Sequence, residues 1–263
     1  MEKQLCEEVI GIARKAGEFI QQSRKNVSTR DIELKGLNDL VSFVDREAEQ
    51  LIIEKLKPLL PDAGFLAEEN TVKQQHNKYL WIIDPLDGTT NYLHGVPCYS
   101  VSIALLENHV PVLGVVHEIN LNETFYAWKK SNAYLNGKEI SVSKVTHLKD
   151  ALIATGFPYT NYSRLKEYMQ VFDYCMKHTH GLRRPGSAAV DLAYTAAGRY
   201  DAFFEYGLNA WDVAAGAFIV QQAGGCVTDF SGKENYIFGK EILAANSLIY
   251  AEFYRVIAAN FNR

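Results

Sequence analysis

The order in which hydrophobic patterns follow one another is the feature of this chain that most constrains its fold. Apolar residues recur at helical spacing in residues 2–23 and 39–57. Short apolar strands follow at residues 79–83, 99–106 and 112–128, and the last two regions have the pattern of a strand meander. Because amphipathic helices and sheets each bury an apolar face against another element, we expect a layered α/β protein.

The second half of the chain alternates strands with helices. Before this half begins, the Asn136-Gly137 pair predicts a hairpin turn. The expected elements are a strand at 151–156, helices at 161–178, 187–197 and 211–223, strands at 201–206, 225–229 and near 242–245, and a helix from about 249. In the helix at 161–178, helical spacing predicts a buried face made of Leu165, Met169, Phe172 and Met176.

Length and composition bound the domain organisation. The chain has 263 residues, 48% of them hydrophobic, and we find no internal repeat, low-complexity tract or linker. We expect one domain over residues 1–263, built of two intimately packed lobes at approximately 1–147 and 148–263. The four cysteines form no CxxC pair and no zinc spacing, which favours reduced thiols. Cys98 and Cys226 have apolar neighbours, so we expect them in the core.

Charge and hydropathy disfavour several classes of function. The formal net charge is −4 and no block of Lys and Arg occurs, so the sequence does not indicate a nucleic-acid binder. The first residues are charged from position 2, and no stretch approaches about 20 uncharged apolar residues. These features predict a cytoplasmic protein without a membrane span.

The stretch WIIDPLDGTTNY, residues 81–92, carries the strongest chemical signal. An apolar strand leads into Asp84, and Pro85 is expected to end that strand because proline cannot extend a central ladder. Gly88 permits a tight backbone, and Thr89 and Thr90 fit the start of a helical turn. Carboxylates suit Mg²⁺ and the free N–H groups at a helix start suit phosphate. The stretch therefore predicts a site for a metal-bound phosphate ester.

Other acids strengthen this interpretation, because an Asp-Pro turn with an Asx cap would explain the stretch if it stood alone. Glu68 follows an apolar pair in LAEEN, and Asp212 opens a helix of small residues in WDVAAG. Asp45 lies in the amphipathic segment DLVSFVD. Magnesium sites are commonly built from acids of distant segments, and phosphate oxygens complete the coordination. We expect Glu68 and Asp212 to join Asp84 and Asp87 in this way.

Rival chemistries lack their residues in this chain. No GxxxxGK[ST] or GxGxxG motif supports a P-loop or Rossmann nucleotide site. No GxSxG elbow, cysteine-arginine phosphatase loop or HExxH zinc motif occurs either. These absences are compatible with a metal-assisted reaction that needs no nucleophilic side chain.

The chain resembles the inositol monophosphatase family, within the lithium-sensitive, Mg²⁺-dependent phosphatase superfamily. WIIDPLDGTTNYLHG and WDVAAGAFIVQQAGG are similar to its two signatures. GSAAVDLAYTAAGRYDAFFEYGLNAWD and DLVSFVDREAE match further family segments in the expected order, so the likeness covers nearly the whole chain. The resemblance implies a five-layer αβαβα sandwich of the inositol monophosphatase and fructose-1,6-bisphosphatase type.

The resemblance also implies a role for each site residue. Two or three Mg²⁺, or Mn²⁺ in their place, would be held by Glu68, Asp84, Asp87, Asp212 and the carbonyl of Leu86. Asp45 would support a weaker metal and, with Thr89 and Glu68, hold the attacking water. Gly88, Thr89 and Thr90 would present N–H groups to the phosphate. The substrate would contact Asp87, Gly186, Ser187, Ala188, Glu205 and Asp212, with a further hydroxyl contact from Asp191.

The sequence departs from the family pattern at two places. Ala67 stands where the family usually has glycine, and Asn70 stands where it has serine or threonine, so the turn after Glu68 is in question. Glu69 is expected to hold Glu68 in place without binding the metal itself. At position 91 the chain has asparagine, and Thr90-Asn91 favours the inositol branch over the nucleotide 3'-phosphatases, which carry lysine after DPLDGT.

These features predict a Mg²⁺-dependent phosphomonoesterase that hydrolyses myo-inositol 1-phosphate by metal-activated water, without a covalent intermediate. Arg183 and Arg184 precede Gly186, so a sugar bisphosphate such as fructose 1,6-bisphosphate stays open as substrate. Histidinol phosphate and 3'-phosphoadenosine nucleotides stay open as well. A scaffold role in a transcription or RNA complex, known for some bacterial members, is a different class of function. From the family we also expect a homodimer and inhibition by lithium.

Overall fold

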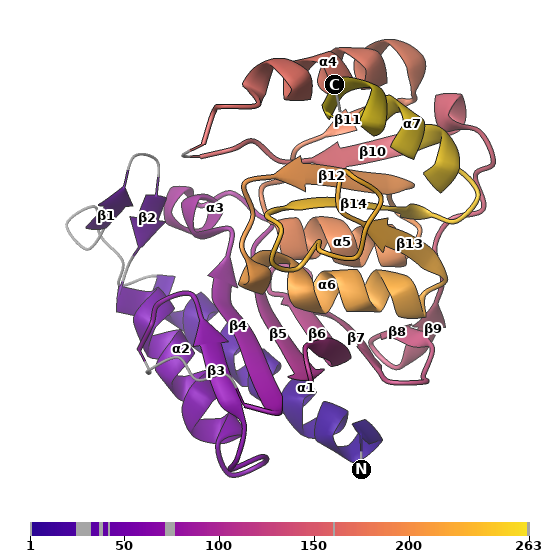
Figure 1. The fold of residues 1–263 in the computed structure, drawn as a ribbon. Coiled ribbons are helices and arrows are strands. Elements are labelled where there is room, and N and C mark those ends of the chain that lie inside the picture. The colour runs from indigo at the N-terminus through magenta and orange to yellow at the C-terminus, as the bar shows by residue number, and fades with distance from the viewer. Residues whose placement is uncertain are drawn as a thin grey trace.

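The computed structural model describes residues 2–24, 33–36, 39–41, 43–71, 77–159 and 161–261, with the backbone alone at 33–36 and 39–41. Its elements stack in alternating layers of helices and sheets, which Figure 1 shows from α1 and α2 at the bottom to α4 and α7 at the top. This arrangement confirms the predicted αβαβα sandwich.

Among the described residues, the first sheet has seven strands in the order β3-β4-β5-β6-β7-β8-β9; β3 pairs with β4 in parallel and the other pairs are antiparallel. The strands are β3 (Gly64–Ala67), β4 (Tyr79–Asp87), β5 (Ser100–Glu107), β6 (Val110–Glu118), β7 (Glu123–Trp128), β8 (Ala133–Leu135) and β9 (Lys138–Ile140). Its outer face is covered by α1 (Glu2–Ser23) and α2 (Phe43–Leu56). A separate antiparallel pair is formed by β1 (Glu33–Gly36) and β2 (Asp39–Val41).

The second sheet has five strands in the order β11-β10-β12-β14-β13. The strands are β10 (Leu152–Thr155), β11 (Gly181–Arg183), β12 (Ala202–Tyr206), β13 (Gly225–Thr228) and β14 (Glu241–Asn246), preceded by the short 3-10 helix η2 (Leu148–Asp150). Helices α4 (Leu165–His178) and α7 (Tyr250–Phe261) cover its outer face, and α5 (Ala188–Ala196) and α6 (Ala210–Gln222) lie between the two sheets (Figure 1). The six-residue helix α3 (Thr89–His94) follows β4.

Burial on both faces explains why the central strands read as continuous apolar runs. Alternate residues of a strand point to opposite faces. In β5, Val101 and Ile103 pack into the cluster under α1 and α2, whereas Ala104 and Leu106 pack into the cluster around α5 and α6. In β6, a Cβ at Gly114 would lie 2.7 Å from the Ala215 carbonyl oxygen. The glycine therefore lets α6 approach the sheet closely.

Strand β4 is longer than the sequence predicted. The expected strand at 79–83 continues to Asp87, and its pairing with β5 is irregular between Asp84 and Asp87. Pro85 lies inside this irregular stretch, which tolerates a residue without an N–H group, so the expectation that it ends the strand is wrong. The helix predicted at 39–57 begins at Phe43, because residues 39–41 pair with β1.

Helix α4 buries a different face from the one predicted. It begins at Leu165, later than residue 161, and its buried residues are Tyr168, Val171 and Cys175. Leu165, Met169 and Met176 are exposed instead. Tyr168 is fixed inward by its hydroxyl, which lies 2.6 Å from the Thr155 hydroxyl. The chain therefore has two neighbouring apolar stripes here, and contact with β10 and β12 selects between them.

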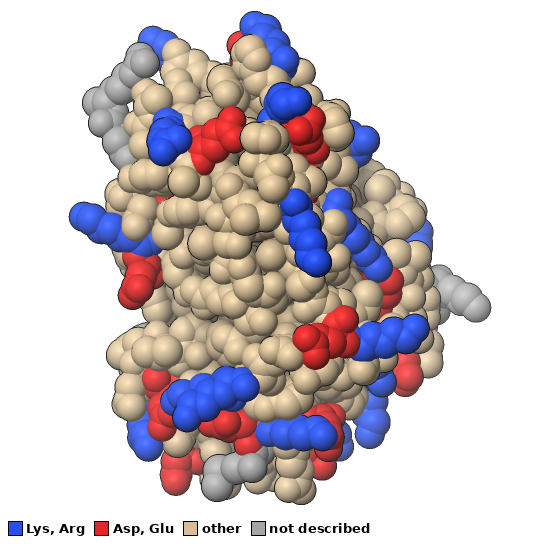
Figure 2. Space-filling model, turned by 90° about the vertical axis from the view of Figure 1, so that its right-hand side faces the viewer, with Lys and Arg blue, Asp and Glu red and all other residues tan. Residues whose placement is uncertain are grey.

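The cysteines and the surface complete the comparison. Cys6 and Cys175 are buried, whereas Cys98 and Cys226 are only partly buried, and all four are free thiols. No helix in the described ranges is long and apolar enough to cross a membrane. Figure 2 shows Lys and Arg interspersed with Asp and Glu around a largely uncharged centre. The boundary between two lobes near residue 147 stays a prediction.

Candidate active site

A cavity of about 190 Å³ collects nearly all the predicted site residues. Segments from both sheets and from the helices between them form its walls. Its lining residues are Glu68, Asp84, Leu86, Asp87, Gly88, Thr89, Thr90, Gly156, Phe157, Pro158, Tyr159, Arg184, Gly186, Ser187, Ala188, Asp191, Glu205, Tyr206, Gly207, Leu208, Asn209 and Asp212. Among the described predicted residues, Asp45 is the one that does not line it.

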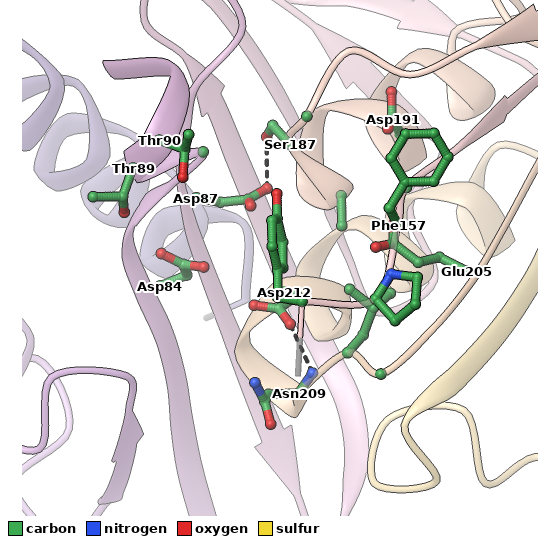
Figure 3. A pocket seen from close by; sticks show the side chains of 18 of the residues that line it. Asp84, Asp87, Thr89, Thr90, Phe157, Ser187, Asp191, Glu205, Asn209 and Asp212 are labelled. Carbon is green, nitrogen blue, oxygen red and sulfur yellow. Dashed lines mark hydrogen bonds between the residues drawn. The ribbon is translucent and has the colours of Figure 1, made fainter. Parts of the chain in front are cut away.

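Three elements bring the four predicted acids to one side. Strands β3 and β4 run in parallel with Ala67 opposite Ile83, so Glu68, directly after β3, lies beside Asp84 within β4. Asp87 follows in the same strand as Asp84. Asp212 lies in the first turn of α6, where its carboxylate accepts a hydrogen bond of 2.6 Å from the Asn209 N–H. Figure 3 shows Asp84, Asp87 and Asp212 facing one part of the pocket.

Burial and mutual repulsion shape the charge of these acids. Burial raises the pKa of Asp84 well above its ordinary value, and the charges of Glu68, Asp87 and Asp212 raise it further. Burial also raises the pKa of Asp87, to about 6, against the opposing effect of hydrogen bonds from Ser187 and Ala189. Carboxylates that repel one another in a buried place favour a bound cation, and hard oxygen donors suit Mg²⁺.

The acids are engaged with backbone donors in this structure. Asp84 Oδ1 accepts a bond of 2.9 Å from the Leu86 N–H, and Asp87 Oδ2 accepts one of 2.7 Å from the Ala189 N–H. Within the described part of the chain, no group of three or more His, Cys, Asp or Glu side chains is arranged as it would be around a metal ion. Asp84, Asp87 and Asp212 each accept a backbone N–H, and their carboxylate oxygens are donors of the kind that Mg²⁺ prefers.

The raised pKa values predict that Mg²⁺ binds more weakly in acid. Protons and cations compete for the same carboxylate oxygens. As the pH falls through about 6, the Asp87 carboxylate takes up a proton and loses the charge that attracts the cation. Calorimetric titration is expected to give a dissociation constant at least about ten-fold higher at about pH 5.5 than at about pH 7.5. Equal affinity for Mg²⁺ at the two pH values would contradict the prediction that Asp87 binds the cation.

The turn after β4, residues 88–90, lines the cavity. Gly88 precedes α3 with φ +96°, a left-handed conformation that glycine adopts without strain. A Cβ there would lie 3.0 Å from the Cys98 carbonyl oxygen. The Thr89 hydroxyl lies 2.9 Å from Asp45 Oδ1 and 3.0 Å from the Leu86 carbonyl oxygen. Asp45 is buried, and it reaches the cavity through Thr89.

The opposite side of the cavity carries a second pair of acids. Glu205 lies on β12 and Asp191 on α5, and both are buried. Burial raises the pKa of both carboxyls well above the ordinary values, and the Arg184 guanidinium partly offsets this. Figure 3 shows both acids on the side of Phe157, away from Asp84. A Cβ at Gly156 would overlap the Glu205 carboxylate, so this glycine makes room for the acid.

Ser187 lines the cavity, as its predicted place beside the substrate requires, and it also contacts Asp87. Its hydroxyl donates a bond of 2.5 Å to Asp87 Oδ2, which Figure 3 marks with a dashed line, so it holds an acid of the first sheet. It also caps α5 by accepting a bond of 3.3 Å from the Val190 N–H. Gly186 and Ala188 line the cavity on either side of it.

An aromatic wall was not predicted. Phe157, Pro158 and Tyr159 follow β10 and line the cavity. The Arg184 guanidinium lies 5.2 Å from the Phe157 ring centre and donates a bond of 2.7 Å to the Tyr159 hydroxyl. Arg183, the other arginine of the pair, is exposed and does not line the cavity. The stretch GFPY, residues 156–159 at the end of the predicted strand, is the sequence signal that could have indicated this aromatic wall.

Glu49 is a second residue that the sequence interpretation missed. It is fully buried on α2 and accepts bonds of 2.6 Å from the Glu69 N–H and 2.7 Å from the Thr71 N–H. It therefore fixes the segment that carries Glu68. Asn70 has φ 54°, a conformation that asparagine tolerates, while Ala67 lies in regular strand β3. The alanine is compatible with the turn because the positive φ falls on Asn70.

The family follows from a comparison of the whole sequence. The model of the Inositol monophosphatase family matches residues 1–262. The chain belongs to the inositol monophosphatase family. "Nus factor SuhB" of Pseudomonas aeruginosa is 43% identical over 245 residues, which is 89% of this chain and 89% of the relative. The "Fructose-1,6-bisphosphatase/inositol-1-monophosphatase" of Thermotoga maritima is 41% identical over 249 residues, 94% and 93% of the two chains.

A solved structure of a relative has the same fold as this inositol monophosphatase family member. The extragenic suppressor protein suhB of Bartonella henselae superposes with a TM-score of 0.89 at 37% identity. The superposition covers 97% of this chain and 98% of that one. The layered arrangement of the two sheets is therefore that of the family.

Proposed function

We propose that this protein is a Mg²⁺-dependent phosphomonoesterase that hydrolyses myo-inositol 1-phosphate to inositol and phosphate. One observation carries the proposal: a single cavity joins four acids and the turn at residues 88–90 to a second pair of buried acids. The first set suits a metal-bound phosphate, and carboxylates of the second set accept hydrogen bonds from hydroxyls.

We assign the metal-holding role to Glu68, Asp84, Asp87, Asp212 and the Leu86 carbonyl, for two or three Mg²⁺ or Mn²⁺. Bound there, the cation would lower the pKa of water and offset charge on the phosphate. Thr89, with Asp45 2.9 Å from its hydroxyl, would orient the attacking water with the help of Glu68. The N–H groups of Gly88, Thr89 and Thr90 would bind phosphate oxygens. No side chain forms a covalent intermediate.

The alcohol half of the substrate would lie against a set of residues on the far side of the cavity: Glu205, Asp191, Gly186, Ser187 and Ala188. Asp191 Oδ1 is buried and has no hydrogen-bond partner among the described residues, so it can accept a hydroxyl of the substrate. Glu205 faces the same cavity from β12. A ring that carries several hydroxyls would satisfy both carboxylates, which favours a polyol phosphate.

The substrate assignment is tested by phosphate release from a panel of esters with Mg²⁺. The panel contains inositol 1-phosphate, fructose 1,6-bisphosphate, histidinol phosphate and 3'-phosphoadenosine 5'-phosphate. We expect the highest kcat/KM for inositol 1-phosphate. A clear preference for another ester would move the substrate and keep the metal site, and no release from any ester would remove the phosphatase assignment.

Hydrolysis of a sugar bisphosphate is the alternative that a particular residue favours. Arg184 lines the cavity, and its Nε is buried without a partner among the described residues, so it could bind a second phosphate. The Thermotoga relative is named for both activities. If so, Arg184→Met should lower kcat/KM for fructose 1,6-bisphosphate about ten-fold more than for inositol 1-phosphate. Arg183→Met is the matched control, and equal losses on both esters would exclude this interpretation.

A role in a transcription complex is the second alternative, because several relatives are named Nus factor SuhB. Retention of all the acids favours catalysis, and the face in Figure 2 carries mixed charges. Capture of RNA polymerase by the purified protein, unchanged in Asp87→Asn, would support this role.

From the family we also propose a cytoplasmic homodimer that lithium inhibits. Sedimentation would check the dimer, and a Li⁺ titration of phosphate release would check the inhibition.

A further inference from the structure

Two segments from different sheets meet at the cavity, and side chains fasten them together. We call residues 84–91, at the end of β4 and the start of α3, the phosphate loop. We call residues 184–189, between β11 and α5, the ring loop. Both line the cavity, and the relation between them sets the distance from the phosphate site to the alcohol site.

Asn91 bridges the ring loop to the chain before β5. Its side-chain nitrogen donates bonds of 2.8 Å to the Cys98 carbonyl oxygen and 2.8 Å to the Pro185 carbonyl oxygen. Both partners are acceptors only, so the bridge needs two N–H groups on one atom, which a carboxamide has and a carboxylate lacks. The Cys98 and Pro185 carbonyl oxygens cannot bond to each other, since both are acceptors.

The backbone around this bridge is closely fitted to it. Gly186 has φ +101°, and a Cβ there would lie 2.9 Å from Asn91 Nδ2. The ring loop therefore packs directly on the carboxamide. Cys98 has φ 84°, a conformation that is unusual for a residue other than glycine. Its carbonyl oxygen is the one that Asn91 holds, so the bond stabilises a strained turn.

A second fastening runs between the same two loops in the opposite direction. Asp87 Oδ2, in the phosphate loop, accepts bonds of 2.5 Å from the Ser187 hydroxyl and 2.7 Å from the Ala189 N–H, both in the ring loop. Asn91 thus donates a hydrogen bond to the ring loop at Pro185, whereas Asp87 accepts hydrogen bonds from that loop. Each fastening limits sliding of one loop along the other.

We propose that Asn91 is a positioning residue that sets the ring loop relative to the phosphate loop and thereby the enzyme's selection for a ring alcohol. The proposal rests on the proposed function in that it takes the phosphate loop for the phosphate site and the ring loop for the alcohol site. Asn91 does not line the cavity, so in our assignment it contacts neither the phosphate nor the alcohol of the substrate and acts through Pro185 and Gly186.

This role separates two kinds of substrate. An ester such as p-nitrophenyl phosphate has no hydroxyls and needs the phosphate loop alone. Inositol 1-phosphate needs both loops in register, and a shift of about 1 Å in a positioning contact can cost about a hundred-fold in rate. Loss of the Asn91 bridge should therefore affect the inositol ester far more than the nitrophenyl ester. A merely structural asparagine would affect both equally.

The test compares Asn91→Asp with the parent protein and with Asn132→Asp, an exposed asparagine in the turn before β8 that adds the same charge. In Asn91→Asp a carboxylate would face two carbonyl oxygens. We expect kcat/KM for inositol 1-phosphate to fall at least about ten-fold, chiefly through KM, and that for p-nitrophenyl phosphate to fall less than about three-fold. Hydrogen exchange at residues 186–190 should become at least about ten-fold faster. Asn132→Asp should match the parent in both.

Equal losses on both esters, or unchanged exchange at residues 186–190, would overturn the proposal. If Asn91→Asp does not fold, Asn91→Ser keeps one donor and removes the added charge, and the same pattern is expected at smaller size. If the parent protein hydrolyses neither ester, the proposed function fails. The exchange measurement then still decides whether Asn91 fastens the loops.

Discussion

Replacement of Asp87 with asparagine is expected to lower kcat for inositol 1-phosphate by roughly three orders of magnitude, since a lost metal contact costs several kcal/mol of transition-state stabilisation. The amide has the shape of the carboxylate, and its oxygen can still accept from Ser187 and Ala189. It removes one of several acids that repel one another around Asp84. The fold should therefore persist, with a melting temperature within a few degrees of the parent.

Phosphate release at saturating Mg²⁺ and thermal unfolding measure the two parts of this prediction. Asp173→Asn is the matched control, because Asp173 lies at the surface of α4, where it pairs with Lys177. The control should retain full activity. A near-normal kcat in Asp87→Asn would remove Asp87 from the reaction, and loss of folding would leave Asp84→Asn as the variant that decides.

Substitution of Gly156 with alanine should have the second largest effect, on substrate binding. The new Cβ would overlap the Glu205 carboxylate, which is buried and must then move. Gly156 is not among the glycines with positive φ, so the alanine adds bulk without straining the backbone. We expect KM for inositol 1-phosphate to rise at least about ten-fold, because a site built to bond a hydroxyl loses that contact.

Hydrolysis of p-nitrophenyl phosphate should be nearly unchanged in Gly156→Ala, since that ester has no hydroxyl for Glu205. Gly11→Ala is the control: it lies in α1 with open space around its Cβ position and should be neutral or slightly stabilising. An unchanged KM for the inositol ester would show that Glu205 does not contact the alcohol.

Regular patterns in the sequence predict most of this fold. The spacing of apolar residues predicts α1, β5, α5 and α6, because each of these elements buries the residues that the spacing selects. The turn residues Asn136 and Gly137 predict the hairpin between β8 and β9. The predicted face of α4 was wrong because Met169 and Tyr168 belong to neighbouring stripes, and contacts with Thr155 on β10 and Phe204 on β12 select Tyr168. The strand through Pro85 was missed because a strand irregularity is not visible in local sequence.

The candidate site divides in the same way. The acids around Asp84 come from recognisable motifs, and the structure places them in one cavity. Glu49 has no motif that predicts its contact with Glu69, since the bond joins segments twenty positions apart. The aromatic wall at Phe157 and the bridge by Asn91 likewise depend on contacts between distant loops, which periodicity does not encode.

The most direct test of the account is the rate of phosphate release from inositol 1-phosphate by the parent protein, measured with and without Mg²⁺. We predict turnover that saturates with Mg²⁺, is abolished by a chelator and returns when Mg²⁺ is restored. A rate no faster than the uncatalysed reaction at saturating Mg²⁺ would contradict the proposed function, provided that a thermal unfolding transition shows the protein to be folded.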